Sequence, residues 1–254
     1  MAEVDELATL DPCSLNNYLR AASVYVRRAP ELTPSQKKAA QIRLSFGLGK
    51  ALIHDLQARL RLTGLRAGEH VVSGALRTVN ADVSQQHSLD GLRLAVEIKP
   101  VNLAVGRAIW NRFGDIRTFA VNLHLKFPFA VIGGVLAIPT WEAAKSREGT
   151  GRKSTVHLIE RAVSRLVRAG GRKTEGDAAH LLEGIAVVVY DPDTAALHAT
   201  LPSSGSGLRW DEFIEALALA YESRFETEEE IAAQVEGDDE EAGAVESDTP
   251  SDAG

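Results

Sequence analysis

The feature that most constrains the fold is a short alternating run at positions 92–99, Leu-Arg-Leu-Ala-Val-Glu-Ile-Lys, which directly follows Asp90-Gly91. Apolar side chains at every second position are typical of a β-strand with one buried face. Aspartate and glycine both tolerate the positive φ angles of a two-residue hairpin turn. We therefore predict a hairpin in which Leu89 pairs with Leu92 and a preceding run forms the first strand.

In this register Asp82 lies opposite Lys99, and Ser84 lies opposite Glu97. Cross-strand partners share a face of the sheet, so Asp82 joins Glu97 and Lys99 on one side. The diagonal between Asp82 and Glu97 is roughly 7–8 Å between backbone positions, which is within reach of one metal ion. Asp90 lies about 23 Å along the strand from Glu97, at ~3.3 Å per residue, and is therefore set aside.

Two carboxylates and a lysine on one strand face suit the hydrolysis of a phosphodiester. Mg²⁺ takes a few carboxylates and keeps several of its waters. An ion held in this way can polarise a phosphate and activate a water, and a neighbouring lysine can hold that water or neutralise developing charge. The alternative for the same residues is a solvated hairpin face on which Glu97 and Lys99 form ordinary salt bridges.

At these residues the sequence resembles the PD-(D/E)XK nucleases, the superfamily with the restriction-endonuclease-like fold. Their pattern of an Asp on one strand and (Asp/Glu)-x-Lys on the next is matched by Asp82 and by Glu97-Ile98-Lys99. Ala81 replaces the proline that often precedes the Asp. The resemblance covers roughly residues 34 to 140. It implies a catalytic set of Asp82, Glu97 and Lys99, with Asp82 and Glu97 as ligands of Mg²⁺ or Mn²⁺, and cleavage of DNA.

The remaining pattern predicts an α/β fold, a mixed central β-sheet flanked by helices. Thr33-Pro34 is a helix start with proline in the first turn, and Gly64 and Gly68 are expected to close that helix. Ser154 is expected to cap a later one. Helices are predicted at 14–28, 33–62, 104–126, 154–169 and 210–225. Strands are predicted at 71–76, 77–87, 92–101, 129–138, 184–190 and 196–201, and Gly133-Gly134 is expected to interrupt the strand 129–138.

The net charge of −7 hides an uneven distribution. Residues 227–254 hold eleven carboxylates and no lysine or arginine, so removing them leaves a body, residues 1–226, with a formal charge of +4. We predict one nuclease-like domain over 1–226, with a core at about 34–140 and an α/β extension at 150–226, and a disordered acidic tail over 227–254. That tail either keeps the protein soluble or competes with DNA for the basic body.

Several basic residues are candidates for contact with the DNA backbone. A helix at 154–169 would carry three arginines on the face opposite its apolar residues. The three arginines are Arg161, Arg165 and Arg168. Arg107 and Asn111, on the helix 104–126 that follows the strand of Glu97, are a further pair of candidates. Arg172 and Lys173 follow the helix and extend the basic stripe. A solvated helix face is the alternative for the stripe, and a structural role is the alternative for the pair.

Asp55 and Glu69 are considered as extra metal ligands, against ordinary surface positions. One cysteine, Cys13, excludes an intramolecular disulfide, and the acidic start lacks the pattern of a signal peptide, so we expect a cytoplasmic protein. The leading function is a type II restriction-like endonuclease that acts on double-stranded DNA as a homodimer, without contact with a membrane. A repair or recombination nuclease, a catalytically inactive nucleic-acid-binding module of the same fold, and a plain interaction domain are the alternatives.

Overall fold

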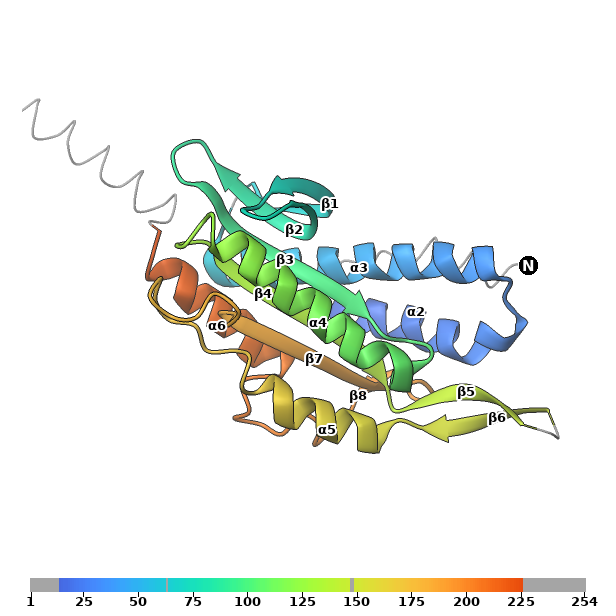
Figure 1. Cartoon of the computed structure of the whole chain (residues 1–254). Coiled ribbons are helices and arrows are strands. Elements are labelled where there is room, and N and C mark those ends of the chain that lie inside the picture. The colour runs from blue at the N-terminus through green and yellow to red at the C-terminus, as the bar shows by residue number, and fades with distance from the viewer. Residues whose placement is uncertain (1–13, 63, 147–148, 226–254) are drawn as a thin grey trace, which may run out of the picture.

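The computed structural model describes residues 14–62, 64–146 and 149–225, and it is built around a six-stranded mixed β-sheet (Figure 1). The strand order is β1-β2-β3-β4-β7-β8. Neighbouring strands are antiparallel except for β3–β4 and β4–β7, which are parallel. The strands are β1 (Arg66–Ser73), β2 (Thr78–His87), β3 (Gly91–Pro100), β4 (Val131–Pro139), β7 (Gly184–Asp191) and β8 (Ala196–Leu197).

Helices cover both faces of this sheet, which confirms the α/β class predicted from the sequence (Figure 1). The first face packs against α2 (Leu15–Arg28), α3 (Pro34–Leu60) and α6 (Trp210–Glu222). The second packs against α4 (Val105–His124) and α5 (Val156–Leu166). The segment predicted as an extension contributes β7 and β8 to the same sheet and α6 to the same apolar core.

Helix α3 begins where the sequence predicts and ends by a different device. The hydroxyl of Thr33 accepts from the Gln36 N–H, and the Gln36 side chain accepts from the Thr33 N–H, which completes a capping box. The helix ends because Arg61 adopts a left-handed conformation at φ 51°. Gly64 and Gly68 do not close it, and Gly68 lies inside β1 at a register shift. The predicted strand 71–76 therefore begins five residues earlier, at Arg66.

The β2–β3 hairpin forms, but its register differs from the predicted one. His87 pairs with Gly91, so the loop has three residues rather than two, and Gly91 takes φ 72°. A second irregularity follows at Gln85–Gln86. Val83 consequently pairs with Val96, and this register continued would place Asp82 opposite Glu97 rather than Lys99.

Strand β4 is fully buried and continuous, so the glycine pair predicted to interrupt it has another role. A Cβ on Gly133 would lie 3.1 Å from the Phe213 ring of α6. A Cβ on Gly134 would lie 2.4 Å from Ile116 Cγ2 of α4. The two glycines thus let a helix approach each face of the central strand closely.

The segment between β4 and β7 departs most from the sequence prediction. Two strands that were not predicted, β5 (Trp141–Ser146) and β6 (Gly149–Ser154), form a separate hairpin. Ser154 ends β6, and Thr155 occupies the N-cap position of the helix; its hydroxyl makes no capping hydrogen bond and donates instead to the Pro139 carbonyl. The predicted strand 196–201 is reduced to β8, because the N–H groups of Thr200 and Leu201 donate to the ring of His198.

Two further predictions concern features outside the sheet. The acidic tail, residues 227–254, and Cys13 lie outside the described residues. Across the part of the chain that the structure describes, no helix combines the length and apolar character needed to cross a membrane.

Candidate active site

Asp82 lies at the point where β2 separates from β3. The pairing of the two strands ends at Val83, which lies opposite Val96. Past this pair the Ile98 N–H of β3 donates to the side chain of Asp82 instead, at 2.7 Å from its Oδ2. Ser45 on α3 lies 3.5 Å from the other oxygen, Oδ1. The side chain is therefore held from two elements, and its position is fixed by a backbone group of the neighbouring strand.

Glu97 and Lys99 project from the same face of β3, as their spacing of two predicts. The Lys99 ammonium forms an ion pair with Glu97 Oε1. The other oxygen, Oε2, is buried and has no hydrogen-bond partner among the described residues. The Glu97 side chain is 11% exposed and that of Lys99 is 24% exposed. One carboxylate oxygen is thus desolvated without compensation, which is costly for a structural ion pair.

Both carboxylates are harder to ionise than usual. Burial raises the pKa of Glu97 to about 7, although the charge of Lys99 opposes the rise. Burial also raises the pKa of Asp82, against the lowering effects of the Ile98 N–H and Lys99. Each carboxylate gains part of its shift from a nearby acid, Asp82 for Glu97 and Glu69 for Asp82. When all are ionised, Asp82, Glu97 and Glu69 carry more negative charge than Lys99 neutralises.

A cleft of about 470 Å³ is lined by Asp82 and Lys99, whereas the buried Glu97 is not among its lining residues. The lining comes from α3, from β1, β2 and β3 with the loop after β3, and from α4, which contributes Ala108 and Arg112. Glu69, whose carboxylate accepts from the Asn80 side chain at 3.0 Å, reaches the cleft beside Asp82. Sequence reasoning did not single out Ser45 or Arg112, because only the fold brings them to the strand.

The donor set fits a hydrated Mg²⁺ or Mn²⁺ rather than a fully caged ion. Among the described residues there is no group of three His, Cys, Asp or Glu side chains placed to hold a metal. Asp82 and Glu97 alone supply two carboxylates, one with an unpaired oxygen. Mg²⁺ in proteins commonly takes one or two carboxylates and retains water in its other positions.

Apart from Glu69, the other residues considered for DNA or metal binding lie outside this cleft. Arg107, Asn111, Arg161, Arg165 and Arg168 are exposed and do not line it. Arg168 lies beyond the end of α5, and Arg165 stacks over the ring of Trp110 at 4.5 Å. Asp55 accepts the indole N–H of Trp210 at 2.7 Å. Asp90 pairs with Arg93 at the hairpin loop.

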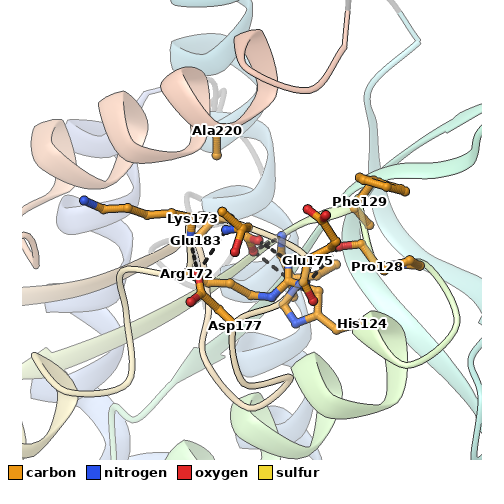
Figure 2. Close-up of polar contacts among 12 residues, drawn as sticks. His124, Pro128, Phe129, Arg172, Lys173, Glu175, Asp177, Glu183 and Ala220 are labelled. Atoms are coloured by element: carbon orange, nitrogen blue, oxygen red, sulfur yellow. Dashed lines mark hydrogen bonds and ion pairs between the residues drawn. The ribbon is translucent and has the colours of Figure 1, made fainter.

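A second polar cluster is buried where β4 and β7 begin, and its residues do not line the cleft (Figure 2). Glu183 accepts from Arg172 and Arg224 at 2.8 Å each through one oxygen. Its other oxygen contacts His124 at 3.2 Å and accepts the Ile132 N–H at 2.8 Å. Arg172 was predicted to extend a basic stripe toward DNA. It is instead 3% exposed and committed to Glu183.

Both oxygens of Glu183 are satisfied, unlike those of Glu97. Burial opposes its ionisation, but the contacts with His124, the Ile132 N–H and Arg172 hold its pKa below the usual range. Figure 2 shows Arg172 and His124 converging on Glu183. A fully paired carboxylate with a lowered pKa is the mark of a structural ion cluster, so the unpaired Glu97 is the stronger candidate for chemistry.

Comparison with known protein families, with curated proteins and with solved structures finds no significant match to this chain. The functional assignment therefore depends on the geometry of the cleft.

Proposed function

We propose that this protein is a metal-dependent nuclease that hydrolyses DNA phosphodiesters at the cleft of Asp82, Glu97 and Lys99. The observation that carries the proposal is the buried, unpaired oxygen of Glu97, which lies next to Asp82 and Lys99, the two members of the set that line an open cleft. The order α3-β1-β2-β3-α4-β4 supports it, because this is the order that the resemblance to PD-(D/E)XK nucleases implies.

Each of the three side chains has a distinct role in the proposal. Asp82 and Glu97 hold Mg²⁺ or Mn²⁺, which supplies polarisation of the phosphate and a more acidic water. The Ile98 N–H keeps the Asp82 carboxylate oriented. The Lys99 ammonium, tethered by Glu97, orients the attacking water and stabilises charge that develops on the phosphate oxygens.

The test is incubation of supercoiled plasmid and circular single-stranded DNA with and without Mg²⁺ or Mn²⁺. Asp82→Ala and Glu97→Ala should each abolish cleavage while the fold, followed by thermal melting, survives. Asp90→Ala is the matched control, because that carboxylate lies on the same hairpin and pairs with Arg93 outside the cleft. Cleavage by either site variant at the wild-type rate would overturn the assignment.

Lys99→Ala separates a catalytic lysine from a phosphate anchor. The variant should retain metal and DNA binding and lose most of its single-turnover cleavage, because the ammonium acts on the transition state. Weakened DNA binding with unchanged single-turnover cleavage would make Lys99 an anchor. DNA binding by the wild type without cleavage in either metal would favour the alternative, an inactive binding module of the same fold.

Two forms of nuclease differ in the assembly that they need. A restriction-type endonuclease that cuts both strands of a symmetric duplex site would act as a homodimer. A repair or recombination nuclease that cuts one strand would need only one copy. The side chains that line the cleft help to decide between a duplex and a single strand as the substrate.

A further inference from the structure

Helix α3 presents two adjacent rows of side chains to the cleft. Gln41 and Ser45, one turn apart, form a polar row, and Ser45 contacts Asp82. Ile42 and Phe46, also one turn apart, form an apolar row. Ile42 is 59% exposed and Phe46 is 42% exposed. A hydrophobic wall open to solvent thus stands next to the charged centre of the site.

The Phe46 ring is bordered by groups that suit a nucleotide. The Lys50 ammonium lies 5.2 Å from the ring centroid. Gly68 of β1 lies near the ring, since a Cβ there would be in ordinary contact with it at 3.5 Å. Leu103 and Ala108 add apolar surface to the same cleft. An aromatic face with a cation beside it is the combination that single-strand-binding proteins use for a base and its phosphate.

We propose that the cleft takes an unpaired nucleotide of single-stranded DNA, with its base against Phe46 and Ile42 and its phosphate at Lys99. This inference rests on the proposed function for the position of the scissile phosphate. In a duplex each base is stacked on both sides, so only an unpaired base can offer its face to Phe46. The volume of about 470 Å³ lies in the range of small-ligand sites, about 300–1,000 Å³.

The charges at the cleft also favour a short single strand over an intact duplex. Its lining contains two cations, Lys99 and Arg112, and Arg112 is paired with Asp115 at 3.0 Å. Duplex binding draws most of its affinity from many phosphate contacts. The exposed arginines of α5 do not line the cleft, so within the described residues it offers no extended basic track.

The experiment compares binding and cleavage of a single strand and a blunt duplex of the same sequence by the full chain. Binding is measured in EDTA by anisotropy, and stacking is measured by the fluorescence of 2-aminopurine in the single strand. Phe46→Ala should weaken single-strand binding by about 5- to 150-fold, the range for loss of one base–aromatic stack. Phe46→Tyr should restore it. Phe129→Ala is the matched control, since that ring is 55% exposed and lies outside the cleft lining.

The wild type should bind and cut the single strand in preference to the duplex, and the 2-aminopurine signal should depend on Phe46. Equal binding of both forms, or single-strand binding that Phe46→Ala leaves unchanged, would overturn the inference. Cleavage that requires Glu97 but ignores strandedness and Phe46 would refute only the single-strand inference. Single-strand binding that depends on Phe46, without cleavage in either metal, would refute only the nuclease.

Discussion

The buried Glu183 cluster offers the clearest test of how this fold is held together. Replacing Glu183 with alanine leaves Arg172 and Arg224 without their carboxylate, with side chains only 1% and 7% exposed. It also leaves the Ile132 N–H and one ring nitrogen of His124 without the carboxylate oxygen that they contact. Removing one partner of a buried pair costs about 3–5 kcal/mol, because the remaining charge stays desolvated.

The matched control is Glu215→Ala. Glu215 also accepts from an arginine, Arg59, but its side chain is 49% exposed, so its loss should cost less than about 1 kcal/mol. For a chain of this size each kcal/mol lowers the melting temperature by about 2–4 °C. Calorimetry should therefore show a drop of about 6–20 °C for Glu183→Ala and only a few degrees for the control. Equal shifts for the two variants would refute the argument that burial sets the cost.

Three further predictions concern stability at low pH, the close packing at Gly134 in β4 and the acidic tail. Because the pKa of Glu183 is lowered on folding, the stability from its ionised form should be present above about pH 4.5 and lost below it; urea melts of Glu183→Gln should show a weaker acid loss than wild type. Gly134→Ala should cost about 1–3 kcal/mol by overpacking, and Ile116→Ala should cost less in that background than alone, whereas additive losses would contradict the contact. A chain ending at Phe225 should melt like the full chain and bind random DNA more tightly at low salt, with a gap that narrows as salt rises; equal affinities at every salt would leave the tail as a solubiliser.

The sequence was most informative where periodicity and local chemistry agree. The strand 92–99 carries a strict alternation, and Thr33-Pro34 carries a cap and a helix start, so both elements appear where predicted. The hairpin register was wrong because Asp90-Gly91 signals a turn without fixing its length. Asp90 binds Arg93 and His87 across a three-residue loop, and that loop, together with the later bulge, shifts the pairing by two residues.

Long-range contacts explain most of what the sequence did not reveal. Gly133-Gly134 suggested an interrupted strand, yet each glycine leaves room for a side chain of a helix that is distant in the chain. Arg172 looked like part of a basic surface, yet Glu183 buries it. Glu183 lies between Leu182 and an apolar, β-branched strand, so burial of its carboxylate could be expected. A buried carboxylate requires a cationic partner, and this was the available signal for Arg172.

The grouping of Asp82, Glu97 and Lys99 survived the register error for a physical reason. Faces of a strand alternate with period two, so a shift of two residues exchanges the cross-strand partner without moving any side chain to the other face. Asp82 also reaches its neighbour strand through the Ile98 N–H rather than through strand pairing. Because this carboxylate accepts a backbone N–H of β3, it keeps its place where the pairing of the two strands ends. The place where the predicted register fails is thus also where Asp82 and Lys99 reach the cleft, with the buried Glu97 next to them.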